Sequence, residues 1–363
     1  MKPRLLITGG GTGGHVSPGL GVAQVWRQRY GRSSVTWVGR QGGIEEKMAA
    51  QAGLPFQAIE AVALKRRAIF SNLALPLVLA RGLKQGAQII QAQRPSAVLM
   101  TGGYVGLPLS LAAARAGIPL VLLEPNAVPG LANRLLKPLA QAICLAYPPK
   151  RPGDKDRLTG TPCRLKLLPS RSAALKRLGF SADKRTLLIL PGSQAARSIN
   201  AALRQALPKL KDRAAHWQWL WMCGQGELES CQAAAKASGL DIQVKVFVQD
   251  VATAYAAADL MLCRSGASTL AELGVAAKPS LQVPYPHATG DHQRANAKAF
   301  VAHGAARLIE DRDVNGLRIE RELRALLDQP KTLKNMASAA RGLSKPGAAG
   351  RVAAELERAA GLR

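Results

Sequence analysis

Short apolar runs alternate with amphipathic segments along most of this 363-residue chain. In the first half, amphipathic segments such as Gly19–Arg29 and Leu107–Ala116 separate the apolar runs. An apolar strand followed by a helix that leads into the next strand is typical of a parallel α/β sheet. Strands are expected at Arg4–Thr8, Val35–Val38, Ala97–Thr101, Leu120–Leu123 and Ala142–Ala146.

The same alternation restarts after a stretch rich in Pro, Gly and Lys, Tyr147–Asp156. The sequence therefore predicts two doubly wound, Rossmann-like domains, 1–155 and 156–340, and a helical segment, 341–363, that can pack back on the first. In open parallel sheets, ligands bind at the carboxyl ends of the strands. The second set of strands is expected at Thr186–Leu190, Trp217–Met222, Val244–Val248, Leu260–Cys263 and Ser280–Val283.

The loop GGGTGGH, residues 9–15, directly follows the first expected strand. Glycines allow positive φ and expose backbone N–H groups at the start of a helix, where anions are favoured. The loop also satisfies the GxGxxG fingerprint of dinucleotide-binding proteins, but the second strand leads into Arg40 and has no acid for a ribose. NAD is therefore disfavoured, and an NADP oxidoreductase with Arg40 on the extra phosphate is one alternative.

His15 closes this loop and allows two interpretations. Its ring can simply pack against the first helical turn. Alternatively, a neutral imidazole beside a bound sugar can act as the general base for a hydroxyl nucleophile.

Three more glycine-containing loops follow expected strands: TGGYVGLP (101–108), PGSQ (191–194) and CRSGASTLAE (263–272). In the last one, Glu272 lies one turn into a helix, where its carboxylate can accept the hydroxyls of a ribose or complement the helix dipole. Four strand-to-helix loops spread over both halves indicate ligands that carry phosphate groups.

Charge and metal chemistry are less informative. The net charge of +27 favours anionic partners. Nucleic acid is disfavoured because aromatic residues make up only 4% and no binding motif is present, although a non-catalytic polyanion-binding protein is a further possibility. The DxD sequences at 154–156 and 311–313 are expected to be solvent-exposed charges, and no metal site is predicted because no His/Cys cluster has suitable spacing.

The segment Leu64–Lys84 combines apolar residues on every helical face with flanking basic residues. It is too short to span a bilayer but can lie on an anionic membrane surface. The alternative is a helix buried between the sheet and another helix. The expected membrane contacts are Lys65, Arg66, Arg67, Phe70, Leu73 and Leu75.

From Leu5 to about Ala297 the chain resembles the MurG family of bacterial peptidoglycan glycosyltransferases. The resemblance is carried, in order, by GGGTGGHVSPG, TGGYVGLP, LEPNAVPG, TPCR, GSQAARSIN, CRSGASTLAE and DHQRANA. It implies a GT-B fold, in which two Rossmann-like domains face each other across a cleft. It also implies inverting transfer of GlcNAc from UDP-GlcNAc to the C4 hydroxyl of an undecaprenyl-diphosphate-linked muramyl pentapeptide, the lipid I to lipid II step of peptidoglycan synthesis.

The resemblance further implies no required cofactor, with Mg²⁺ only stimulatory, and a peripheral position on the cytoplasmic face of the inner membrane. His15 would be the general base. The donor would be bound by Thr12, Gly13, Gly14, Asn126, Arg164, Gly192, Ser193, Val248, Ala267, Ser268, Thr269, Leu270, Glu272 and Gln293. The acceptor diphosphate would meet Gly10, Gly11, Gly102, Gly103 and Tyr104. Another GT-B enzyme, such as a UDP-GlcNAc 2-epimerase or a lipid glycosyltransferase, is the closest alternative.

Overall fold

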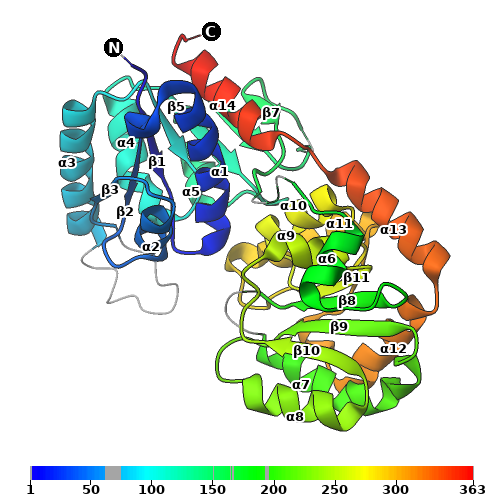
Figure 1. Ribbon diagram of the computed structural model, residues 1–363. Coiled ribbons are helices and arrows are strands. Elements are labelled where there is room, and N and C mark those ends of the chain that lie inside the picture. The colour runs from blue at the N-terminus through cyan, green and yellow to red at the C-terminus, as the bar shows by residue number, and fades with distance from the viewer. Residues whose placement is uncertain are drawn as a thin grey trace. The chain divides into compact units, whose positions relative to one another are not determined.

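The computed structural model describes residues 2–61, 75–149, 151–163, 165, 167–192 and 196–362. The chain forms two compact units, the first comprising Met1–Arg164 and Lys345–Arg363 and the second Leu165–Ser344 (Figure 1). The boundary expected between residues 155 and 156 lies later in the chain. Strand β7, Asp156–Leu158, belongs to the first unit because it pairs with β6, Ala142–Leu145.

The first unit is a parallel sheet of order β3-β2-β1-β4-β5-β6-β7 covered by helices on both faces. Its other strands are β1 Leu5–Thr8, β2 Val35–Gly39, β3 Phe56–Ala58, β4 Ala97–Met100 and β5 Leu120–Glu124. Its helices are α1 Gly13–Tyr30, α2 Ile44–Gln51, α3 Leu75–Gln93, α4 Leu107–Arg115, α5 Leu131–Leu136 and α14 Ala348–Ala359. Short 3-10 helices are Arg32–Ser34, Tyr104–Gly106 and Lys137–Leu139.

The second unit repeats this design with strand order β10-β9-β8-β11-β12-β13. Its strands are β8 Arg185–Leu190, β9 Trp217–Met222, β10 Asp241–Lys245, β11 Leu260–Cys263, β12 Ser280–Gln282 and β13 Ala306–Leu308. Its helices are α6 Arg171–Leu178, α7 Arg197–Ala206, α8 Leu228–Ser238, α9 Val251–Ala257, α10 Ala267–Ala276, α11 His292–Ala302, α12 Gly316–Leu327 and α13 Pro330–Leu343. Its 3-10 helices are Leu207–Arg213, Thr289–Asp291 and Asp311–Asp313.

Continuous apolar sequence explains the central strands, because a parallel strand is covered on both faces. Every residue of β1, β4 and β5 is buried. In β9, the alternating Trp217, Trp219 and Trp221 all enter one core with residues of α7 and α12. The two sheets confirm the predicted fold class of two doubly wound α/β domains.

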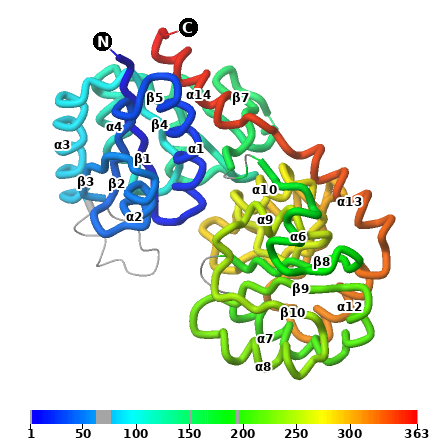
Figure 2. The backbone as a smooth tube through the Cα atoms, viewed as in Figure 1, coloured from blue at the N-terminus to red at the C-terminus, as the bar shows by residue number. Residues whose placement is uncertain are grey.

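The tail of the chain returns to the first unit, where α14 runs beside α1 (Figures 1 and 2). Glu357 of α14 is fully buried and its Oε1 accepts hydrogen bonds from Arg29 Nη1 at 2.7 Å and Tyr30 Oη at 3.0 Å. Arg351 donates two hydrogen bonds to the carbonyl of Thr159. These contacts explain why the last helix is part of the first unit.

The expected strand Val244–Val248 was wrong in its placement. The strand is β10, Asp241–Lys245, which begins soon after the left-handed Gly239 and pairs with β9. It lies at the edge of the sheet and is only half-buried, so its sequence lacks the apolar signal on which the expectation depended. The strands β3 and β7 were missed for a related reason, since each is three residues long and only partly buried.

Candidate functional site

The candidate residues of the first unit follow three neighbouring strands, β1, β4 and β5. The chain proceeds outward from β1 through β2 to β3 and then returns to place β4 beside β1, with Thr8 opposite Met100. Such a switch in strand order opens a crevice at the carboxyl ends of the strands, where α/β proteins bind ligands. The loops that begin at Gly9 and Thr101 both start at this switch point.

The first two glycine loops pack directly on each other. The Gly10 N–H donates to the carbonyl of Gly102 at 3.1 Å. A Cβ at Gly103 would overlap the Gly10 carbonyl, and one at Gly9 would overlap the Thr101 hydroxyl; both glycines also have positive φ. Glycine is therefore required at 9 and 103 by the contact between the loops, independently of any ligand.

Glu45 is a buried residue that the sequence analysis missed. Its carboxylate, in the first turn of α2, accepts hydrogen bonds from the N–H groups of Gly11 at 3.2 Å and Arg40 at 3.1 Å. A Cβ at Gly10 would lie 2.5 Å from this carboxylate. The N–H groups of Gly10 and Gly11 are thus already hydrogen-bonded within the protein, so their predicted contact with the acceptor diphosphate stays a prediction.

The start of α1 offers a more accessible set of amides. Its N-cap residue, Thr12, makes no side-chain capping bond, and the first N–H groups of a helix have no intrahelical partner. Among the described residues, a Cβ at Gly13 or Gly14 would meet no atom closer than 3.7 Å. The geometry around Thr12, Gly13 and Gly14 therefore suits an anion at the positive end of the helix dipole.

The His15 ring is oriented by the two glycine loops. Its Nδ1 lies 2.9 Å from the carbonyl oxygen of Gly10, which can only accept, so this nitrogen carries the proton. In the neutral ring Nε2 then holds the lone pair. A Cβ at Gly102 would lie 3.1 Å from Nε2 and 2.8 Å from Cδ2, so glycine at 102 leaves room for the imidazole.

Glu124 organises the loop that follows β5 and carries Asn126. Its Oε1 accepts hydrogen bonds from both the backbone and side-chain N–H groups of Asn126, each at 3.0 Å. Its Oε2 accepts from the Gly130 N–H at 2.8 Å and from Asn133 Nδ2 at 2.9 Å. Sequence reasoning missed this role, and the only signal was an acid at the end of an apolar run.

In the second unit, the candidate loops follow β8, β11 and β12, which are again neighbours at a switch point. Gly192 has φ of 96°, and no atom of the described residues lies within 4 Å of where its Cβ would stand. Val248 is buried just before α9. The remaining predicted acceptor contact, Tyr104, belongs to the first unit and lies half-buried on the 3-10 helix Tyr104–Gly106. Arg164 and Ser193 lie outside the described residues.

Gly266, Thr269 and Gln293 converge at the start of α10. A Cβ at Gly266 would lie 4.0 Å from both Gln293 Nε2 and Thr269 Oγ1. Gln293 Oε1 accepts a hydrogen bond from the Tyr285 N–H at 3.0 Å. The Nε2 group of the same amide is then the one that can donate to a ligand. In the same turn of α10, Ala267 and Leu270 are buried and Ser268 is partly buried.

Glu272 lies on α10 with 9% of its surface exposed. Its Oε2 accepts a hydrogen bond from Tyr255 Oη at 3.0 Å, a contact that sequence reasoning did not find. The nearby Cys263 thiol has its pKa raised to about 12, mainly by burial and secondarily by the Glu272 carboxylate. Tyr255 thus holds the carboxylate in one orientation at the end of the site.

Asp311 corrects the expectation that the second DxD sequence is solvent-exposed. Its side chain is 19% exposed and its Oδ1 is bound by Arg264 Nη1 at 2.5 Å and by Ser198 Oγ at 2.8 Å. The first DxD is also only partly exposed, because Asp156 accepts from the Gly153 N–H and pairs with Lys137. Among the described residues, no His, Cys, Asp or Glu cluster could hold a metal ion.

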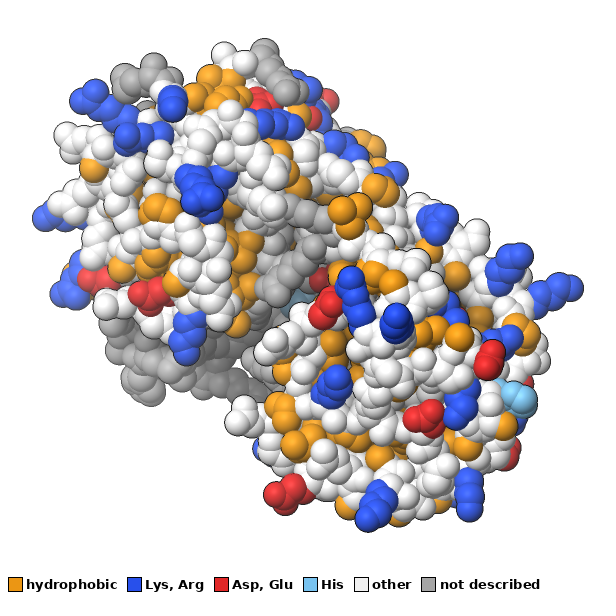
Figure 3. All heavy atoms as spheres, in the orientation of Figure 1, with side chains coloured by type: hydrophobic (Ala, Val, Ile, Leu, Met, Phe, Trp, Pro, Cys, Tyr) orange, Lys and Arg blue, Asp and Glu red, His pale blue; other side chains and the backbone are white. Residues whose placement is uncertain are grey.

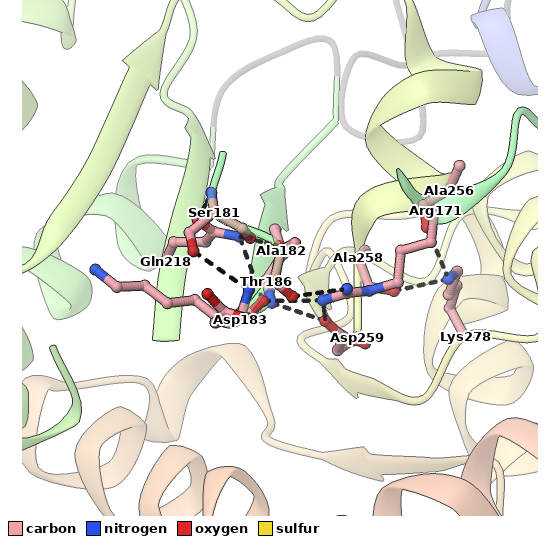
Figure 4. A network of polar contacts seen from close by, with 11 residues as sticks. Arg171, Ser181, Ala182, Asp183, Thr186, Gln218, Ala256, Ala258, Asp259 and Lys278 are labelled. Atoms are coloured by element: carbon pink, nitrogen blue, oxygen red, sulfur yellow. Dashed lines mark hydrogen bonds and ion pairs between the residues drawn. The ribbon is translucent and has the colours of Figure 1, made fainter. Parts of the chain in front are cut away.

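A second polar network lies at the opposite, amino-terminal ends of β8, β9 and β11 (Figure 4). Asp259 Oδ2 accepts from Arg171 Nη2 at 3.0 Å and from the Thr186 N–H at 2.8 Å. Lys278 Nζ donates to the Ala258 carbonyl at 2.7 Å, and burial lowers the pKa of this lysine. Because ligands bind at the other end of parallel strands, this network stabilises the sheet and is not part of the candidate site.

Most of the expected membrane segment, including Lys65, Arg66, Arg67, Phe70 and Leu73, lies outside the described residues. Leu75 begins α3, which packs against α4 and exposes Leu77 and Leu79. Over the described residues, no helix is long and apolar enough to cross a bilayer. On the face drawn in Figure 3, Lys and Arg side chains are spread singly and outnumber Asp and Glu.

Comparison with known proteins defines the class of this site. Residues 5–145 match the N-terminal domain of glycosyltransferase family 28 and residues 186–352 match its C-terminal domain. A Pseudomonas fluorescens relative, named UDP-N-acetylglucosamine–N-acetylmuramyl-(pentapeptide) pyrophosphoryl-undecaprenol N-acetylglucosamine transferase, is 39% identical over 96% of both chains. The crystal structure of Acinetobacter baumannii MurG has a TM-score of 0.83 at 29% identity, covering 98% of this chain and 99% of its own.

A crystal structure of a UDP-N-acetylglucosamine 2-epimerase also aligns, with a TM-score of 0.67 and 15% identity over 100% of this chain and 98% of the epimerase. At that identity, the likeness shows a shared fold alone. The two matched domains, each with loops at the switch point of its sheet, together define a glycosyltransferase of the GT-B class.

Within that class, the chain belongs to glycosyltransferase family 28, among its MurG members. The family and the enzyme class predicted from the motifs are therefore confirmed.

Proposed function

We propose that this enzyme transfers GlcNAc from UDP-GlcNAc to the C4 hydroxyl of a muramyl pentapeptide linked to undecaprenyl diphosphate. The main support is the name of the Pseudomonas fluorescens relative, since the similarity extends over 96% of both chains. The site supports the same reaction, because each unit presents strand-end loops suited to a phosphate-bearing ligand. The loops of the second unit would hold the donor, and those of the first would hold the acceptor.

On the donor side, each ligand group has a matching residue. The Gly192 backbone, Ser193 and Arg164 would bind the diphosphate, and Val248 would lie beside the uracil. Glu272, held by Tyr255, would accept the ribose hydroxyls. Gln293 Nε2 would donate to a hydroxyl of the sugar, since its Oε1 already accepts a hydrogen bond from the Tyr285 N–H. The resemblance also assigns Asn126 to the sugar.

His15 is proposed to be the general base. With Nδ1 donating to the Gly10 carbonyl, Nε2 is the atom that would take the C4 hydroxyl proton as the oxygen attacks the anomeric carbon. The bond from that carbon to the UDP oxygen breaks on the opposite face, so an α-linked donor gives a β-linked product. The negative charge that develops on UDP is stabilised by helix N-termini and by Arg164.

This arrangement requires no metal ion for the chemical step, and Mg²⁺ would act only by binding the diphosphates. Transfer should therefore continue in excess EDTA, with at most a severalfold decrease in rate. Complete loss of transfer in EDTA, restored by Mg²⁺, would contradict this part of the proposal.

We also propose that the first unit lies on the cytoplasmic face of the inner membrane as a peripheral protein. An apolar groove of about 220 Å³ is lined by Leu83, Leu111, Ala114, Arg115 and Leu139, from α3, α4 and the 3-10 helix Lys137–Leu139. Exposed leucines and cations lie along α3, α5 and this 3-10 helix, which suits anionic lipid. They are Leu77, Leu79, Arg81, Lys84, Arg134, Leu135 and Lys137.

Vesicle flotation tests the membrane proposal. The enzyme should bind vesicles that contain phosphatidylglycerol better than neutral ones, and Leu79→Glu combined with Leu139→Glu should weaken that binding. The matched control is Leu317→Glu, which changes a leucine of the second unit that is 66% exposed. Equal binding by both variants would contradict the assignment of this face.

The reaction itself is tested by incubating the enzyme with radiolabelled UDP-GlcNAc and the muramyl lipid. Label should move into the lipid fraction only when the acceptor is present. Conversion of UDP-GlcNAc without acceptor would instead support an epimerase. Binding of NADPH in place of UDP would support an NADP oxidoreductase, and binding of nucleic acid in place of UDP would support a polyanion-binding protein.

A further inference from the structure

We propose that Asp311 is a positioning residue for the donor sugar, which acts through Arg264 on the segment that orients Gln293. The inference deepens the proposed function and rests on it, because it takes Gln293 as a contact of the sugar. Three linked features of the second unit support it: a partly buried ion pair, the loops it joins, and the hydrogen bond that fixes the Gln293 amide.

The partly buried ion pair lies at the carboxyl edge of the sheet. Arg264 follows β11 and its side chain is 11% exposed, while that of Asp311, just after β13, is 19% exposed. Arg264 Nη1 binds Asp311 Oδ1, and Arg264 Nη2 donates to Ser198 Oγ at 3.1 Å. Ser198 in turn donates to Asp311 Oδ1 at 2.8 Å. A guanidinium this buried needs a counter-charge, and Asp311 supplies it.

The guanidinium then reaches the loop that follows β12. Arg264 Nη1 also donates to the carbonyls of Val283 and Pro284, each at 3.1 Å. Its central carbon lies 5.7 Å from the centre of the Tyr285 ring, within the range of a cation–π contact. Arg264 thus joins the segments after β8, β11, β12 and β13, and the first three of these segments carry the candidate loops.

The last link is the peptide N–H of Tyr285, which donates to Gln293 Oε1 at 3.0 Å. Because Pro284 and Tyr285 are consecutive, a shift of the Pro284 carbonyl moves the group that fixes the Gln293 amide. The neighbouring Arg294 pairs with Asp291 at 3.2 Å and Glu310 at 3.0 Å, so it does not replace this contact. Asp311 therefore acts on the contact between Gln293 and the sugar through Arg264 and the Pro284–Tyr285 peptide, and does not touch the ligand itself.

The test separates the sugar from the nucleotide. Asp311→Asn removes the charge and keeps the shape, and the matched control is Asp313→Asn. Asp313 belongs to the same DxD sequence, but its side chain is 56% exposed and its ion pair with Arg312 is long, at 3.9 Å. Isothermal titration calorimetry with UDP and with UDP-GlcNAc gives two dissociation constants for each variant.

For Asp311→Asn, the dissociation constant of UDP-GlcNAc should rise about tenfold relative to that of UDP, which corresponds to about 1.4 kcal/mol. For Asp313→Asn, the ratio of the two constants should not change. Arg264→Lys keeps the positive charge but lacks the planar guanidinium that binds several acceptors at once, so it should change the ratio as Asp311→Asn does. This variant replaces Asp311→Asn in the test if Asp311→Asn does not fold.

Equal weakening of both ligands would show that Asp311 only supports the fold, and an unchanged ratio would show that it does not act on the sugar; either result overturns the inference. Failure of the parent enzyme to bind UDP-GlcNAc at all would instead refute the proposed function.

Discussion

Glu124→Gln offers a sharp test of how the first unit holds its site. Glu124 is 2% exposed, and each of its two carboxylate oxygens accepts two N–H groups. Glutamine has nearly the same shape, but its NH₂ group must replace one oxygen. Whichever way the amide is turned, two N–H donors then face another donor, so two hydrogen bonds are lost without creating a cavity.

The size of the effect follows from those two bonds. A hydrogen bond to a charged group contributes about 1.5–3 kcal/mol, so the loss is about 3–6 kcal/mol, and part of it is recovered if the loop 125–130 moves toward solvent. We expect the free energy of unfolding of the first unit to decrease by about 2–4 kcal/mol. Because this loop carries Asn126, kcat/KM for transfer should decrease at least about 100-fold, the equivalent of about 2.7 kcal/mol.

Urea unfolding and steady-state transfer assays measure the two quantities, and UDP binding serves as the control. Because Glu124 hydrogen-bonds none of the described residues proposed to bind UDP, the affinity for UDP should not change. Parent-like stability and kcat/KM in Glu124→Gln would refute the reasoning.

Three further predictions test other parts of the account. His15→Ala should decrease kcat at least about 100-fold with little change in the affinity for UDP-GlcNAc, because the ring is proposed to act on the acceptor hydroxyl; an unchanged kcat would place the base elsewhere. Glu357→Ala should decrease the free energy of unfolding by about 2–4 kcal/mol in urea, since it leaves Arg29 and Tyr30 without the buried carboxylate; no change would mean that α14 is held by its apolar face alone. The Cys144 and Cys263 thiols, with pKa values raised by burial to about 12 against an ordinary 9.0, stay protonated in the folded state at pH 10, whereas the unfolded thiols ionise. The free energy of unfolding should therefore decrease as pH rises above 9, by about 1.4 kcal/mol per thiol between pH 8 and 10 in reducing buffer. In Cys263→Ala this decrease should be smaller by the contribution of one thiol. The same pH dependence in Cys263→Ala and the parent enzyme would contradict the raised pKa of Cys263.

The fold could be predicted from the sequence where strands are fully buried. Central strands such as Leu260–Cys263 read as unbroken apolar runs because both faces are covered. Edge strands could not be placed in the same way. In Asp241–Lys245 the two end residues are exposed, and its register is fixed by pairing with β9.

The candidate site shows the same division. Loops that follow buried strands could be located from glycines and the strand pattern, and the structure places them at the switch points of both sheets. The residues that fix those loops could not be found, because their contacts join distant parts of the chain. Glu45 reaches Gly11, and Asp311 reaches Arg264. Neither pairing leaves a local pattern in the sequence.

The central claim is that UDP-GlcNAc binds at the carboxyl ends of β8, β11 and β12. Hydrogen–deuterium exchange with and without UDP-GlcNAc tests it most directly. The account predicts slower exchange in peptides that cover 191–200, 264–272 and 284–293, and no change at the opposite end of the sheet around Asp259 and Lys278. Protection concentrated at that opposite end, or none in the three segments at saturating UDP-GlcNAc, would contradict it.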